Sequence, residues 1–186
     1  MTDEAIESLY TEAKGMPDVL RDEAGDYGTR LHEALATQEP DAEERYPGIK
    51  AYYAWLEEQG LEVVHREVPV YHHVEGYGGT LDAIAYREGV PDPVILDYKT
   101  SSAIYWEVSL QIAAYAYAWN AMIQDYPVAS VGVEGWALRF PKLKPTGKQA
   151  TFEAKKVSDM ADSFNGFLSA KGLWAASKQK PWAVLG

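Results

Sequence analysis

The sequence predicts an α/β fold in which a central mixed β-sheet of about four to five strands is flanked by helices. Three observations predict it: helical spacing of apolar residues before residue 60, three short strand-like runs after it, and a long aromatic-rich helix that follows them. A length of 186 residues suits one domain. We therefore expect a single domain over residues 1–186, with a helical part over 1–60, the sheet and its helix over 61–140, and a basic loop and C-terminal helix over 141–186.

Three helices are expected in the N-terminal part. The first is acidic and covers about residues 3–14, the second covers Thr29–Thr37, and the third covers Tyr46–Gln59. In the third, apolar residues recur at steps of three and four: Ile49, Tyr52, Tyr53 and Leu56. Gly60 is a suitable end point, because glycine adopts the conformation that terminates a helix.

Three strands are expected next, as neighbours in the sheet. The first, Leu61–Tyr71, contains the alternating run Val64, Arg66, Val68 and Val70. The second is Gly78–Tyr86. The third, Pro93–Tyr98, is a short apolar run that ends in charged residues, as a buried strand does where it emerges at a functional end.

A helix, a strand and a second helix complete the predicted order. The helix Trp106–Ile123 carries few charges, so it should be buried on more than one face against the sheet. A strand over Ser130–Phe140 follows, and the last helix runs from about Lys156 to Lys178. The proline- and lysine-rich stretch PKLKPTGK between them is expected to be a loop.

The composition excludes several classes of site. Without cysteine, the chain can form no disulfide, thiolate zinc site or iron–sulfur cluster. Without a G-x-x-x-x-G-K-[ST] loop, no nucleotide cofactor is expected. No apolar segment is long enough to cross a membrane, and the acidic start MTDEAIESLY lacks the features of a secretory signal. We expect a cytoplasmic protein, located in the host cytoplasm if the chain is phage-encoded.

Charge is distributed unevenly along the chain. The net charge is −11, yet residues 139–186 hold nine basic and three acidic side chains. This segment could follow a phosphate backbone, and its candidate DNA contacts are Arg139, Lys142, Lys144 and Lys148. A solvated lysine-rich surface would explain the same residues equally well.

Two carboxylates and a lysine form the most informative constellation. If GTLDAIA and VILDYKTS are adjacent strands, Asp82 and Asp97 can meet, and Lys99 lies two residues beyond Asp97 on the same face. Paired carboxylates suit a hard divalent ion such as Mg²⁺ or Mn²⁺. The lysine can orient or deprotonate an attacking water and offset developing charge. The set is coherent for phosphodiester hydrolysis.

Four motifs, in this order, make the sequence resemble the PD-(D/E)xK nuclease superfamily and specifically its RecB-like exonuclease branch. They are a G-x-x-x-H helix motif at Gly28–His32, GTLD at Gly79–Asp82, DYK at Asp97–Lys99, and Q-x-x-x-Y at Gln111–Tyr115. The resemblance covers residues 28–115 well, and the literal proline before the first acid is missing, as is usual in this branch.

The resemblance implies a restriction-endonuclease-like core that binds Mg²⁺ or Mn²⁺ and acts on DNA. The implied metal ligands are His32, Asp82, Asp97 and the main-chain carbonyl of Tyr98. The implied catalytic residues are Asp82, Asp97, Lys99, Gln111 and Tyr115. Glu67 stands where many members carry a glutamate, which either faces the metal or supports its ligands.

The leading functional hypothesis is an exonuclease that acts on DNA ends or single strands in recombination, repair or replication, similar to stand-alone phage exonucleases. A helicase, single-strand-binding or recombination partner would be a separate protein. Two alternatives stay open: a catalytically silent DNA-binding or scaffold domain of the same fold, and a structure- or site-specific endonuclease.

Simpler explanations exist for several of these side chains. His32 could be a partly buried helix histidine, and Gln111 and Tyr115 share a helix face that could belong to the core. A zinc site from His65, His72 and His73 is disfavoured, because His72 should lie on the opposite strand face from the other two.

Overall fold

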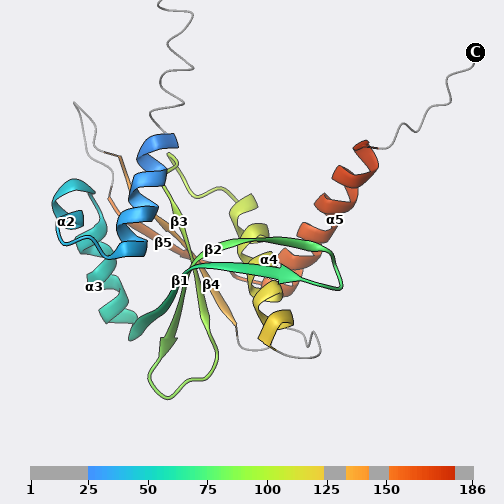
Figure 1. Cartoon of the computed structure of the whole chain (residues 1–186), viewed down its shortest axis with the longest axis horizontal. Coiled ribbons are helices and arrows are strands. Elements are labelled where there is room, and N and C mark those ends of the chain that lie inside the picture. Colours follow the sequence, from blue (N-terminus) through green and yellow to red (C-terminus); the bar gives the residue numbers. More distant parts are fainter. Residues whose placement is uncertain (1–24, 124–132, 143–150, 179–186) are drawn as a thin grey trace, which may run out of the picture.

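The computed structural model of the protein describes residues 25–123, 133–142 and 151–178. Residues 25–37 are helical, and the labelled elements follow in chain order: α2 (Ala42–Arg45), α3 (Ile49–Gln59), β1 (Leu61–His72), β2 (Tyr77–Arg87), β3 (Val94–Lys99), α4 (Glu107–Ile123), β4 (Glu134–Arg139), β5 (Glu153–Lys156) and α5 (Met160–Lys178) (Figure 1). Among the described helices, none has the length and apolar character needed to span a membrane.

The five strands form one mixed sheet in the order β1-β2-β3-β4-β5. Strands β1, β2 and β3 pair antiparallel, β3 and β4 pair parallel, and β5 returns antiparallel along β4. The parallel step is possible because α4 carries the chain from the end of β3 back to the start of β4. This architecture confirms the predicted α/β fold with a mixed sheet flanked by helices.

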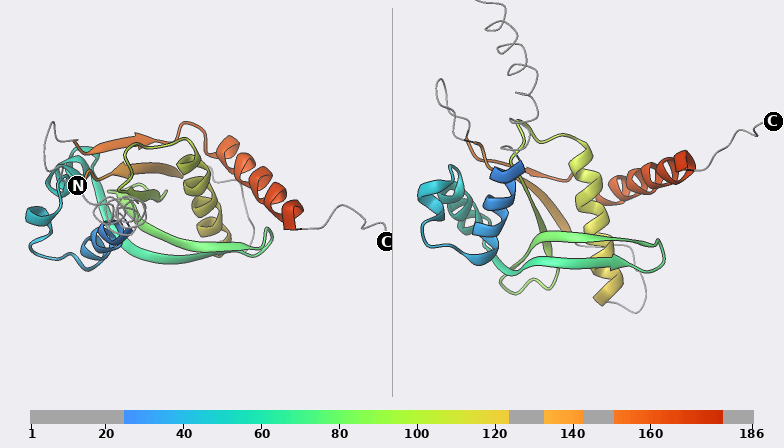
Figure 2. Two further views of the ribbon diagram at one scale, coloured as in Figure 1. Left: turned by 90° about the horizontal axis from the view of Figure 1, so that it is seen from above. Right: turned by 45° about the horizontal axis from the view of Figure 1, so that its top comes forward.

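Two apolar cores lie on opposite faces of the sheet. The helix over residues 25–37, together with α2 and α3, packs against alternate strand residues, among them Leu96 and Leu138. On the other face α4 packs against Ile84, Ile95 and Ala137. In both views of Figure 2 the N-terminal helices lie at one side of the molecule, and α4 and α5 lie at the other. The sheet is therefore covered on both faces at its centre.

The N-terminal helices differ from the prediction in their bounds. Residues 25–28 are already helical, whereas the second helix was expected from Thr29. The third begins at Ile49 rather than Tyr46, because Gly48 before it has a left-handed backbone (φ 104°) that a continuous helix cannot contain. The short helix α2 was not predicted. The expected helix over residues 3–14 lies outside the described residues.

The segment after the basic loop also differs from the prediction. A helix was expected from about Lys156, but Lys156 ends the edge strand β5, and α5 begins only at Met160. Asp159 marks the true helix start, because its carboxylate accepts a hydrogen bond of 2.9 Å from the Asp162 amide. The strand was missed because Glu153–Lys156 is only four residues long and its register is set by β4.

Close packing of α4 on the sheet depends on Gly135 of β4. A Cβ atom there would lie 2.3 Å from Cγ2 of Ile112 and 3.2 Å from Sδ of Met160. We therefore expect Gly135→Ala to lower the free energy of unfolding by about 1–3 kcal/mol, measured by urea denaturation. The matched control is Gly172→Ala on α5, where no atom of the described residues lies within 4 Å of the added Cβ and a gain of up to ~1 kcal/mol is expected. Equal stability of the two variants would contradict this packing.

Candidate functional site

The site is centred on the point where β2 and β3 separate. The two strands are paired from Ala85 and Val94 to Ala83 and Leu96, and the next residue of β2 is Asp82. Oδ2 of Asp82 accepts a hydrogen bond of 2.6 Å from the Tyr98 amide. The carboxylate thus replaces the main-chain carbonyl that would accept this hydrogen bond in a continuous strand pair. The Asp82 carboxylate is therefore held against β3 at the point where the pairing of the two strands ends.

His32 and Glu67 join Asp82 at this opening. His32 reaches it from the helix over residues 25–37, and its Nδ1 lies 3.1 Å from Asp82 Oδ1. Glu67 stands opposite Asp82 on β1, between the pairs that join Arg66 to Ala83 and Val68 to Leu81. One possible ligand atom from each of His32, Glu67 and Asp82 lies within 4.8 Å of the other two. The three elements thus bring together one imidazole and two carboxylates.

Glu67 has an unusual backbone for a strand residue. Its φ is +48°, in the left-handed region that non-glycine residues rarely adopt. Such a conformation costs of order 1–3 kcal/mol and persists where the surrounding structure enforces it, often at functional sites. Here it accompanies the carboxylate that faces His32 and Asp82. The sequence resemblance drew attention to Glu67, but no pattern in the residues predicted its strain.

The charges of this cluster act on one another. Burial lowers the pKa of His32, but the hydrogen bond to Asp82 and the Asp82 charge outweigh it, so the pKa is raised overall. Burial and the nearby Asp82 carboxylate both raise the pKa of Glu67, although His32 opposes them. In both cases the negative charge of Asp82 contributes to the raised pKa, so negative charge accumulates at this cluster. A divalent cation would neutralise that charge.

Asp97 and Lys99 form a buried ion pair beside the cluster. Asp97 lies near the end of β3, where its side chain is 2% exposed, and Lys99 Nζ is 2.6 Å from its Oδ2. Lys99 is the only close polar contact of this buried oxygen among the described residues. Burial raises the pKa of Asp97 to about 6, against the opposing charge of Lys99.

Gln111 and Tyr115 of α4 continue this arrangement. Lys99 Nζ donates a hydrogen bond of 3.1 Å to Gln111 Oε1, and Gln111 Nε2 donates one of 2.9 Å to the Tyr115 hydroxyl. Because the amide must accept at its oxygen and donate at its nitrogen, the two contacts fix its orientation. The Q-x-x-x-Y pair therefore holds the lysine from the α4 side.

Motif glycines allow the surrounding elements to approach. A Cβ at Gly79 would lie 2.8 Å from the Tyr115 ring, so any larger residue there would have to displace that ring. At Gly28 a Cβ would lie 3.1 Å from Oγ1 of Thr100. Each glycine thus joins two motifs that are distant in sequence, a role that sequence reasoning did not assign.

The three histidines of the β1 region do not converge. His65 is exposed beside the Trp119 ring, at 5.8 Å between centroids. His72 is 3% exposed and stacks on Phe164 at 6.0 Å, and His73 follows the strand. Among the described residues, the group of possible metal ligands consists instead of His32, Glu67 and Asp82.

The candidate DNA contacts are only partly described. Arg139 of β4 is paired with Lys99 of β3. Its side chain is only 12% exposed, and its Nε lies 2.8 Å from Glu153 Oε2. Lys142 Nζ lies over the Tyr27 ring, 5.7 Å from its centroid. Lys144 and Lys148 lie outside the described residues. The structure therefore places Arg139 beside the site in an ion pair.

Comparisons with known proteins give one informative match. A family model described as the PD-(D/E)XK nuclease superfamily matches residues 6–179. No curated protein matches the chain. A solved structure described as "Crystal structure of SSO0001" is 13% identical, covers 96% of this chain and 67% of its own, and superposes with a TM-score of 0.34. The family match spans all the elements described above.

Proposed function

The chain belongs to the PD-(D/E)XK nuclease superfamily, and on this premise we propose that it is a divalent-metal-dependent nuclease that hydrolyses phosphodiester bonds in DNA. One observation carries the proposal. The group formed by His32, Glu67 and Asp82 stands beside the Asp97–Lys99 pair, so a set of possible metal ligands adjoins a cationic side chain. This is the arrangement that metal-assisted attack on a phosphate requires.

The residues present fit Mg²⁺ or Mn²⁺. Carboxylate oxygens and one imidazole nitrogen suit such ions, and Asp97 offers a buried oxygen whose close contact is the Lys99 ammonium. In our proposal the ligands come from His32, Asp82, Asp97 and the Tyr98 carbonyl, with Glu67 facing the same ion. A bound ion would lower the pKa of a coordinated water and stabilise charge on the phosphate.

Lys99 has a separate role in this proposal. Its Nζ is held between Asp97 and Gln111, and its side chain is 22% exposed. From there the ammonium can donate to a phosphate oxygen or orient a water for attack, which stabilises the negative charge that develops as the bond breaks. Gln111 and Tyr115 are positioning residues, since they act through the lysine.

Within the superfamily, we infer an exonuclease of the RecB-like branch, acting on DNA ends or single strands in recombination, repair or replication. The four ordered motifs, including G-x-x-x-H and Q-x-x-x-Y, support this assignment. Without cysteine or a phosphate loop the chain itself offers no iron–sulfur cluster or ATP-driven motor. We propose a helicase, single-strand-binding or recombination protein as the partner that acts with it.

The exonuclease assignment is tested by comparing linear and covalently closed circular DNA. End-labelled linear single and double strands are digested beside a closed circle of the same sequence. We expect the linear DNA to be degraded and the circle to persist. Cutting of the circle would instead identify an endonuclease, and binding without cutting in any metal would identify a silent DNA-binding domain.

Metal binding is expected to stabilise the fold. An ion that binds only the folded chain adds ~2.7 kcal/mol at 100 times its dissociation constant. We therefore expect Mn²⁺ to raise the unfolding temperature of chelator-treated protein, and His32→Ala to remove most of that rise. His65→Ala is the matched control, because that histidine is exposed beside Trp119. An equal rise in both variants would contradict the assigned ligand.

Gly79 is expected to affect activity through Tyr115. In Gly79→Ala the new Cβ displaces the Tyr115 ring, which breaks the hydrogen bond to Gln111 and releases Lys99. We expect kcat for DNA cleavage to fall by about tenfold to a hundredfold, as misplaced catalytic groups commonly cause. Gly172→Ala again serves as the control. Wild-type kcat in Gly79→Ala would show that the Tyr115 position is unimportant.

A further inference from the structure

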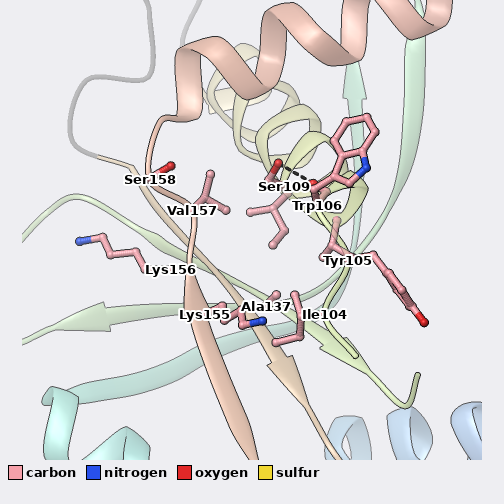
Figure 3. Close-up of a pocket in the computed structure, with 11 residues that line it drawn as sticks. Ile104, Tyr105, Trp106, Ser109, Ala137, Lys155, Lys156, Val157 and Ser158 are labelled. Carbon is pink, nitrogen blue, oxygen red and sulfur yellow. Dashed lines mark hydrogen bonds between the residues drawn. The ribbon is translucent and has the colours of Figure 1, made fainter. Parts of the chain in front are cut away.

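A cavity of about 260 Å³ lies between the start of α4 and the strands β4 and β5. We call it the α4–β5 pocket. Figure 3 shows Trp106 and Ser109 on one side, Val157 and Ser158 on the opposite side, and Ala137 and Lys155 between them. Nothing in the proposed chemistry uses this pocket. Its lining combines apolar side chains with two lysines and two serines, and it includes the exposed Tyr105 and Trp106.

The pocket lies one strand away from Asp97 and Lys99. Ala137, in its lining, is in parallel register with Asp97, and adjacent strands lie about 4.8 Å apart. On α4, the lining residue Ile112 directly follows Gln111. A DNA strand with its scissile phosphate beside Asp97 and Lys99 would therefore have a neighbouring nucleotide within reach of the pocket.

The aromatic residues at the pocket are unusually exposed. Trp106 is 71% exposed and Tyr105 is 53% exposed, although both line the cavity. Neither ring is needed for the cores, which are formed by other residues. Rings placed in this way beside a nucleic-acid path are suited to stacking on bases, an interaction that every base can make.

The charges around the pocket also suit a nucleic-acid strand. Lys155 pairs with Ala137 on the neighbouring strand, and its side chain stays 54% exposed while Nζ lies 3.0 Å from Glu153 Oε1. Glu153 is shared with Arg139, so this group of three carries one net positive charge. The single carboxylate is neutralised, and the remaining charge favours a phosphate at the rim.

We propose that the α4–β5 pocket binds one unpaired base of the strand that is cut, stacked on Trp106, with the adjoining phosphate beside Lys155. The inference rests on the proposed nuclease function and deepens it. The volume is below the ~300–1,000 Å³ of most small-molecule sites, which suits a single planar base. A base must leave the duplex to enter a pocket. The DNA bound at this position would therefore be single-stranded or frayed.

Binding tests the pocket without any cleavage. Single strands that carry 2-aminopurine at successive positions are titrated in chelator, and the quenching of its fluorescence reports stacking. We expect quenching at one position with wild-type protein, its loss in Trp106→Ala together with a roughly tenfold weaker affinity, and its retention in Trp106→Phe. Trp174→Ala, which removes a tryptophan that is 64% exposed on α5, is the matched control and should behave as wild type.

Two results would overturn the proposal: quenching that is unchanged in Trp106→Ala, or no binding of the strand by wild-type protein at low salt. Either would leave the pocket to an apolar segment of a protein partner. If wild-type protein binds and quenches but cuts nothing with Mg²⁺ or Mn²⁺, the base pocket stands and the proposed nuclease function fails.

Cleavage supplies an independent test in the active enzyme. An abasic site at the position that enters the pocket should lower kcat/KM roughly tenfold in wild-type protein, and Trp106→Ala should lower it by a similar factor on the intact strand. Combined, the two changes should cost little more than either alone, because both remove the same stack. Fully multiplicative losses would contradict a contact between Trp106 and that base.

Discussion

Replacement of Lys99 by alanine should lower the rate of DNA cleavage by about 10²–10⁴-fold while the fold persists. The lysine supplies the cationic group nearest to the buried Asp97 carboxylate, at 2.6 Å, and Gln111 holds it in place at 3.1 Å. No other described lysine or arginine forms an ion pair with Asp97 or Asp82. Steady-state kinetics on labelled single-stranded DNA in Mn²⁺ measures the loss.

The control for this variant addresses both activity and folding. Lys50→Ala removes an exposed lysine from α3, on the other side of the sheet, and should retain wild-type kinetics. Removal of Lys99 also raises the pKa of Asp97, so the variant's folding is best compared with wild type at about pH 5, where that carboxyl is largely protonated. A folded Lys99→Ala protein with wild-type kcat would refute the catalytic role of the lysine.

Asp97→Asn should abolish cleavage and at the same time stabilise the metal-free protein above pH 6. The carboxylate is buried, and burial raises its pKa from the ordinary 3.8 to about 6, so the folded protein favours the neutral form. A shift of this size corresponds to ~3 kcal/mol of destabilisation at pH 8. Asparagine has nearly the same shape but carries no charge, so it avoids this cost.

The sign of the pH dependence follows from the raised pKa. The unfolded chain loses the Asp97 proton near pH 4 and the folded protein near pH 6, so this residue's contribution to stability falls across that interval. In chelator, urea unfolding of wild type and Asp97→Asn should therefore agree below about pH 4 and diverge by pH 8. A variant no more stable than wild type at pH 8 would show that Asp97 is well accommodated as an anion.

The sheet was predictable because its strands carry strong local patterns. Alternation in Leu61–Tyr71 and the apolar run before Asp97 identified β1 and β3 to within one residue at each end. The edge strand β5 was missed because four residues carry no clear period, and its pairing with β4 determines its structure. The start of α3 depended on the left-handed Gly48, which sequence spacing does not reveal.

For the site, the motifs located the residues but not their contacts. The order of His32, Asp82, Asp97 and Lys99 was readable, yet the separation of β2 and β3 that seats Asp82 against the Tyr98 amide arises only from tertiary structure. The left-handed backbone of Glu67 and the packing of Gly79 on Tyr115 likewise join residues far apart in sequence. Such close approaches depend on the packed fold rather than on local propensity.

The most direct test of the central claim is digestion of end-labelled linear DNA by wild-type protein in Mg²⁺, in Mn²⁺ and in chelator, with metal added back to the chelated sample. We expect loss of linear DNA with either metal, none in chelator, and recovery of activity when metal is restored. Cleavage that persists in chelator, or no cleavage with either metal, would contradict a metal-dependent nuclease built on His32, Glu67, Asp82 and Asp97.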